Sequence, residues 1–106
     1  MAKFKAEKIP YTEQDRLIKK FGQILAQLKT NDAITGFLKD LLNRQERIMF
    51  IRRLQIAEML EDGKTYAEII TKLHCGPATI ARIERWLNFG RDGIKKAIKI
   101  NKTMRD

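Results

Sequence analysis

The sequence has very few of the residues on which catalytic and metal chemistry depend. Its 106 residues include one cysteine and one histidine, the neighbours His74 and Cys75. A single cysteine excludes an internal disulfide, and one residue of each kind is too few for a zinc site. Adjacent side chains in a tight turn do not usually converge as a Cys–His dyad must, and we find no phosphate-binding loop. We therefore expect neither an enzyme nor a bound metal or cofactor, and we assign Cys75 to the core.

Long hydrophobic runs are also missing. The longest in the middle of the chain is Ile48–Ile51, whereas a membrane-spanning helix needs about 20 apolar residues. The N-terminal sequence MAKFKAEKIP lacks the apolar segment of a signal peptide. These absences predict a cytoplasmic protein with no membrane partner.

Signals for β-strands are absent as well, since no Val- or Thr-rich segment alternates with polar residues. The apolar residues instead recur at helical spacing, which predicts an all-α fold. We expect a first helix with Thr12 as its N-cap that stops at Lys29, and a second helix from Asp32 to about Leu42.

The length of the chain suits one domain. We expect residues 1–10 to form a mobile basic arm, 11–100 a single all-helical domain, and 101–106 a basic C-terminal tail. A domain of this size buries a thin core, which a second subunit would thicken.

The third predicted helix is apolar on all sides. Asn43 and Glu46 have the spacing of a capping box at its start, and Asp62-Gly63 should stop it near Glu61. A helix that is apolar all round is buried all round, and so small a chain can hardly cover it alone. The pattern therefore predicts a homodimer with heavily shared helices. The residues behind it are Ile48, Met49, Phe50, Ile51, Leu54, Ile56, Ala57, Met59 and Leu60.

The charge is strongly positive and uneven. The chain has 22 Lys and Arg residues against 13 Asp and Glu, a net charge of +9. Residues 76–105 hold eight basic and two acidic side chains, whereas residues 57–72 hold two basic and four acidic ones. Such an excess suggests a polyanionic partner, most often nucleic acid and sometimes an anionic membrane surface. RNA is disfavoured because no aromatic stacking platform is evident.

The basic half begins with a pattern typical of a helix-turn-helix, predicted over residues 65–88. Thr65 and Glu68 have capping-box spacing, so they should start a short helix. His74 stands where such motifs need a left-handed residue, and histidine is enriched at positive φ. Gly76 adds flexibility to the turn, and Pro77 suits the first position of the next helix. An ordinary helical hairpin with a solvated basic face is the simpler reading, but the local charge favours DNA binding.

The second helix of this motif should present a DNA-binding face. Its N-terminal tip is small, which allows close approach to base edges, and its free N–H groups can hold a phosphate. Arg82 suits a bidentate pair with guanine or a phosphate contact. The candidate DNA-binding residues are Thr65, Gly76, Pro77, Ala78, Thr79, Arg82 and Arg85.

The segment LLNRQERIMFIRRLQIAEMLEDGKTYAEIITKLHCGPATIARIERW resembles the Trp repressor family, and especially Trp-repressor-like bacterial proteins of unknown operator. It runs from Leu41 to Trp86; the earlier helices match loosely. The most telling parts are QER, the helix end at Leu60–Gly63, and GPATIAR, where the family has a glycine, an apolar residue and ATITR. The resemblance implies an intertwined all-helical dimer whose two reading heads meet successive major grooves of an operator.

The resemblance also implies an effector pocket, in which the family holds the indole of L-tryptophan between two arginines. Arg82 matches one arginine and Arg52 the other, with Arg53 as an alternative. Ile83 stands where tryptophan-binding members have glycine, and Trp86 replaces a serine of the pocket wall. Both changes add bulk, and the Trp86 indole could stack on the Arg82 guanidinium. We expect Trp86 to fill the corepressor space, so that tryptophan is not needed; an ordinary core or rim residue is the alternative.

These features together predict a transcriptional regulator, a repressor in the simplest case, that binds a palindromic operator in double-stranded DNA as a homodimer. The alternative is a helix-turn-helix module that makes protein contacts within a larger DNA-associated assembly. The first reading predicts steep salt dependence and the second does not.

Overall fold

The computed structural model describes residues 5–90 and 92–105, and these are entirely helical apart from their connections. They form a short 3₁₀ turn, η1 (Ala6–Lys8), and six α-helices. The all-α prediction is therefore confirmed. Among the described residues, no helix is long and apolar enough to cross a membrane. The chain divides into two compact units, residues 1–42 and 43–106, whereas a single domain over 11–100 was predicted.

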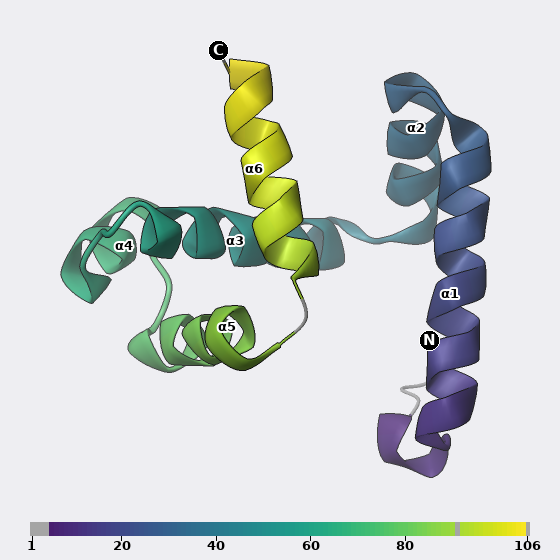
Figure 1. Ribbon diagram of the computed structural model, residues 1–106, viewed down its shortest axis with the longest axis horizontal. Helices are drawn as coiled ribbons and strands as arrows, with labels where there is room; N and C mark the ends of the chain where they lie inside the picture. The colour runs from purple at the N-terminus through teal and green to yellow at the C-terminus, as the bar shows by residue number, and fades with distance from the viewer. Residues whose placement is uncertain (1–4, 91, 106) are drawn as a thin grey trace. The chain divides into compact units, whose positions relative to one another are not determined.

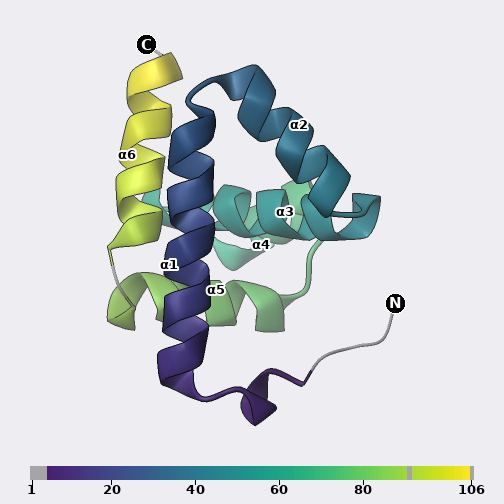
Figure 2. The ribbon, with the colours of Figure 1, turned by 90° about the vertical axis from the view of Figure 1, so that its right-hand side faces the viewer.

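The first unit is a helical hairpin of α1 (Tyr11–Leu28) and α2 (Asn31–Leu41). Figures 1 and 2 show α2 folding back from the C-terminal end of α1. The Phe21 and Phe37 rings meet with their centroids 5.9 Å apart, which ties the two helices together. At the other end of α1, the Gln14 amide donates to the carbonyls of Ala6 and Ile9 at 2.9 and 2.7 Å. The described part of the predicted arm thus forms η1 and hydrogen-bonds to α1.

Both predicted starts in this unit are displaced. Thr12 is not the N-cap of α1, because the Pro10 carbonyl accepts from the Gln14 N–H at 2.9 Å and the helix begins at Tyr11. The next helix begins one residue before the predicted Asp32, because the Thr30 hydroxyl accepts from the Ala33 N–H at 3.1 Å and so caps it. A polar side chain marks a helix start only to within a residue or two.

The second unit is built around α3 (Arg44–Glu61), with α4 (Tyr66–Leu73), α5 (Pro77–Phe89) and α6 (Gly93–Arg105) packed against it (Figure 1). Both predicted capping boxes, Asn43 with Glu46 and Thr65 with Glu68, are confirmed. Every helix of this unit contributes to one core. Its buried residues are Ile56 and Ala57 from α3, Ile69 and Leu73 from α4, Ile80, Ile83 and Leu87 from α5, and Ile98 from α6. Cys75 is half-buried beside this core.

The first half of α3 keeps its apolar side chains exposed within the single chain. Phe50 is 52% exposed and Ile51 53% exposed, while Ile56 and Ala57 further along are fully buried. Helices α4, α5 and α6 therefore cover only part of α3. The homodimer expected to cover the rest stays a prediction.

The last helix, α6, extends further than expected. Its residues 101–105 were predicted as a tail but continue the helix. Two polar contacts hold it to α3: the Asn101 amide donates to Glu58 Oε1 at 2.9 Å, and Lys102 Nζ lies 2.7 Å from Asp62 Oδ1. Residues assigned to the tail thus fix α6 on the core.

Candidate nucleic-acid interface

The turn between α4 and α5 has the predicted left-handed residue. His74 adopts φ 55° and ψ 45°, and its N–H donates to the Ile70 carbonyl at 2.8 Å. This conformation stops α4 sharply and lets the chain start α5 only three residues later. Gly76 is in an ordinary extended conformation, φ −86°, so it is not needed for a left-handed turn.

The N-terminus of α5 is open. Gly76 is its N-cap and has no side chain to occupy the amides of the first turn, and Pro77 takes the first helical position as predicted. A Cβ at Gly76 would meet nothing within 4 Å. The small residue therefore serves no packing purpose in the chain itself, and the tip is free to approach another molecule closely.

The seven candidate DNA-binding residues all lie exposed on the helix-turn-helix. Ile80, Ile83 and Leu87 anchor the inner side of α5 in the core. Arg82 and Arg85 are exposed on the other side of that helix. The arrangement is a rigidly packed helix with a small tip and two free-standing cationic side chains, as groove binding requires.

Sequence reasoning missed a hydrogen bond that joins the two helices of the motif. The Tyr66 hydroxyl, at the start of α4, donates to Glu84 Oε1 on α5 at 2.8 Å. This bond raises the pKa of the Tyr66 phenol, because ionisation would leave two anions side by side. Residues 18 apart in the chain give no local signal for such a pair.

Beyond α5, the basic character continues on α6. Lys95, Lys96 and Lys99 are exposed, and the helix contains no acidic residue. Two of these lysines lie near the start of the helix, where the macrodipole disfavours positive charge. The location of the basic surface thus agrees with the uneven charge seen in the sequence.

A small cavity of about 300 Å³ opens beside α5 and is lined by Phe50, Arg53, Leu54, Trp86 and Ile94. The Arg53 guanidinium lies 5.7 Å from the centroid of the Phe50 ring and 5.7 Å from that of Trp86. Both distances are within the range of cation–π attraction. The cavity is therefore lined by an indole and a guanidinium that belong to the chain.

The residues around this cavity differ from those of the predicted effector pocket, which stays a prediction. The guanidinium over Trp86 is that of Arg53, on α3, and not that of Arg82. Arg52 is turned toward Gln55, with its Nη1 3.4 Å from the amide oxygen. Ile83 is buried in the core rather than in the cavity wall. Of the four predicted pocket residues, only Trp86 lines the cavity.

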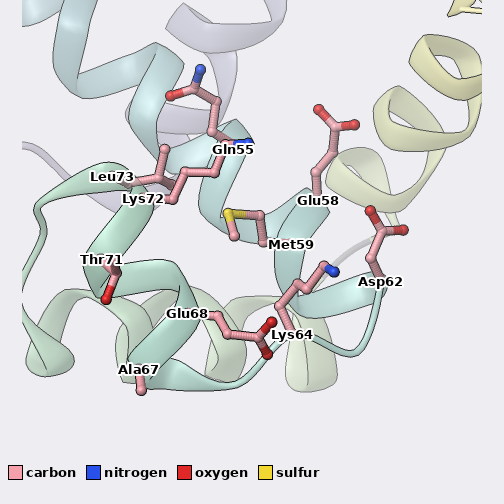
Figure 3. Close-up of a pocket in the computed structure, with 10 residues that line it drawn as sticks. All are labelled: Gln55, Glu58, Met59, Asp62, Lys64, Ala67, Glu68, Thr71, Lys72 and Leu73. Carbon is pink, nitrogen blue, oxygen red and sulfur yellow. The ribbon is translucent and has the colours of Figure 1, made fainter.

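A second, larger hollow of about 670 Å³ lies between α3 and α4 and contains none of the predicted site residues (Figure 3). Its charged side chains are of both signs, with Glu58, Asp62 and Glu68 on one hand and Lys64 and Lys72 on the other. Among the residues described, no group of three or more His, Cys, Asp or Glu side chains could hold a metal ion.

Comparison with known proteins agrees with this arrangement. The model of the Trp repressor protein family matches residues 16–102. The uncharacterized protein YerC of Bacillus subtilis (strain 168) is 36% identical over 92 residues, which cover 87% of this chain and 85% of that protein. The crystal structure of a TrpR like protein from Eubacterium eligens ATCC 27750 is 29% identical, with a TM-score of 0.75, and the match covers 82% of this chain and 90% of that one. The chain therefore belongs to the Trp repressor family, which is non-enzymatic.

Proposed function

We propose that this protein is a sequence-specific DNA-binding regulator of transcription, in the simplest case a repressor, that acts in the cytoplasm. The observation that carries the proposal is the exposed face of α5, with its open tip at Gly76 and its two free arginines, Arg82 and Arg85. The tip would enter the major groove, where an arginine can pair with guanine. The arginines and the lysines of α6 would neutralise phosphates.

The regulator acts as a homodimer on a palindromic operator. The exposed apolar side chains of α3, Ile48, Met49, Phe50, Ile51 and Leu54, support this part of the proposal because water-soluble monomers rarely leave such a cluster uncovered. Two copies related by a twofold axis would place their α5 helices in successive major grooves. The half-sites should then lie about 34–36 Å apart, one turn of DNA.

The regulator binds its operator without L-tryptophan. In support, the Trp86 indole forms part of the wall of the cavity beside α5, with the Arg53 guanidinium 5.7 Å from the ring centroid. Trp86 is 38% exposed. An added indole would have to share the cavity of about 300 Å³ with the Trp86 and Arg53 side chains, which already lie within cation–π range of each other.

Selection of bound sequences from random duplex DNA, with and without L-tryptophan, tests the proposal. We expect a palindromic site to emerge, with the same sequence and affinity in both conditions. Enrichment of no sequence would reject DNA recognition, and a palindrome that appears only with tryptophan would reject the ligand-free mechanism alone. Calorimetry with L-tryptophan gives an independent check, since micromolar binding would contradict a regulator that needs no tryptophan.

The second candidate is a protein-interaction module in a larger DNA-associated assembly. The exposed apolar residues Phe89, at the end of α5, and Ile100 and Met104, on α6, favour it, and Phe89 is 85% exposed. This reading predicts a weak dependence of binding on salt and no palindromic preference. The DNA reading predicts that affinity falls steeply with salt.

A further inference from the structure

The hydrogen bond between Tyr66 and Glu84 joins two side chains that are 18 residues apart, and so links α4 to α5. Tyr66 is the first residue of α4 and follows the helix cap Thr65, one of the candidate DNA contacts. Glu84 lies midway along α5, between Arg82 and Arg85 in the sequence. At about 100° per residue, Glu84 lies on the flank of α5, beside the proposed DNA-facing side that carries the two arginines.

Glu84 is the only acidic residue of α5, and it is exposed. A carboxylate that moves freely on this helix would repel the phosphates that the neighbouring arginines attract. Holding this carboxylate away from the phosphates should therefore raise the affinity of α5 for DNA.

Tyr66 is well suited to hold it. Its ring is half-buried and packs against the core, while the hydroxyl reaches the surface. The ring packing fixes the position of the donor before any bond forms, so little side-chain entropy is lost on making it. A hydrogen bond to an ionised acceptor is also stronger than a neutral one.

We propose that Tyr66 is a positioning residue for DNA recognition, which holds the Glu84 carboxylate against α4 and away from the phosphates. The inference rests on the proposed function, because it assumes that α5 meets DNA. In this proposal Tyr66 acts through Glu84 and does not contact DNA itself.

The test is a double-mutant cycle of Tyr66→Phe, Glu84→Gln and the combined variant, with affinity measured on the selected duplex at low and at moderate salt. Phenylalanine keeps the packed ring and removes only the hydroxyl, and glutamine keeps an acceptor without the charge. We expect Tyr66→Phe to weaken binding about three- to fivefold at low salt and less at moderate salt, as for an exposed charge effect. In the Glu84→Gln background, the same tyrosine change should have no effect.

The control is Tyr11→Phe, at a tyrosine that is 84% exposed in the other unit; it should leave affinity unchanged. A loss that is equal with and without Glu84→Gln would overturn the inference, because Tyr66 would then act on DNA or on the fold by itself. No loss in Tyr66→Phe would overturn it too. Failure of the unmodified protein to prefer the selected duplex over a scrambled one is a separate outcome, which rejects the proposed function and this inference with it.

Discussion

At the residue scale, the open tip of α5 makes the clearest distinction between a structural and a binding role. Gly76 has an ordinary φ, and a Cβ there would meet nothing within the chain. Packing within the chain therefore does not require glycine here, and close approach of DNA is the reason that the proposed function supplies. A substitution at this position separates the two roles.

We predict that Gly76→Ala weakens operator binding about tenfold or more, because the added Cβ would hold the tip away from the base edges and a good base contact is worth about 1–3 kcal/mol. The fold should lose only about 1 kcal/mol or less, because alanine is a poorer N-cap than glycine. Circular dichroism and fluorescence anisotropy measure the two quantities. The control is Gly36→Ala in α2, where a Cβ also meets nothing. Equal operator affinity in both variants would show that the tip does not approach DNA closely.

The cap of α4 should make stability depend on acid. Hydrogen bonds with Thr65 lower the pKa of Glu68 below its ordinary value of 4.5, helped by the charge of Lys64. Because the pKa is lower in the folded state, the stabilisation is present above pH 4.5 and is lost as pH falls through the folded value. We predict that Glu68→Gln is less stable than the unmodified protein at neutral pH, and that the difference shrinks as the pH falls below 4.5.

Urea denaturation across this pH range measures that difference. Glu61→Gln is the matched control, because Glu61 is an exposed carboxylate of the same type that caps no helix. A gap between Glu68→Gln and the unmodified protein that stays constant with pH would contradict the account.

At the element scale, helix starts and stops were predictable where a local rule decides them. The pairs Asn43 with Glu46 and Thr65 with Glu68 carry their own signal, since both partners lie within one turn of helix. The left-handed His74 followed from the short distance between two apolar patterns. The start of α1 was not predictable in this way, because its N-cap is Pro10 and no side chain caps the helix.

Contacts between elements escaped prediction. Periodicity shows which face of α5 is apolar, but it does not show which residue of α3 meets that face. For this reason Arg82 was expected over Trp86, and Arg53 lies there instead. The hydrogen bond of Tyr66 with Glu84 was missed on the same ground: it depends on how α4 and α5 pack, and not on either helix alone.

The basic face of α6 gives a prediction about the helix as a whole. If Lys95 and Lys99 neutralise phosphates, changing both to Gln should reduce the slope of log affinity against log salt by up to about 2 per chain. The same loss is expected on operator and on random DNA, because phosphate contacts carry no sequence information. Changing Lys19 and Lys20 of α1 is the matched control, as both are exposed lysines in the other unit. An equal change of slope in the two variants would contradict phosphate neutralisation by the lysines of α6.

At the scale of the whole molecule, the exposed first half of α3 is the basis for the proposed homodimer. We predict that Ile51→Glu, at a residue that is exposed in the single chain, produces a folded monomer that has lost operator binding. Burying a carboxylate in an apolar interface is strongly unfavourable, so the change should block association. Analytical ultracentrifugation at micromolar concentration measures the molecular mass of the variant and of the unmodified protein, and so distinguishes monomer from dimer. A stable monomer of the unmodified protein would refute the dimer at once.

The family and the fold follow from the whole chain, whereas recognition of an operator depends on the few side chains that α5 presents. The most direct test of that central claim is the affinity of the unmodified protein and of Arg82→Ala for the selected palindromic duplex and for a scrambled duplex of equal length. We predict two chains per palindrome, a preference of at least about 10³ over the scrambled duplex, and a loss of about 1–3 kcal/mol in specific binding for Arg82→Ala. Equal affinity for the two duplexes, or an unchanged operator affinity in Arg82→Ala, would contradict the account.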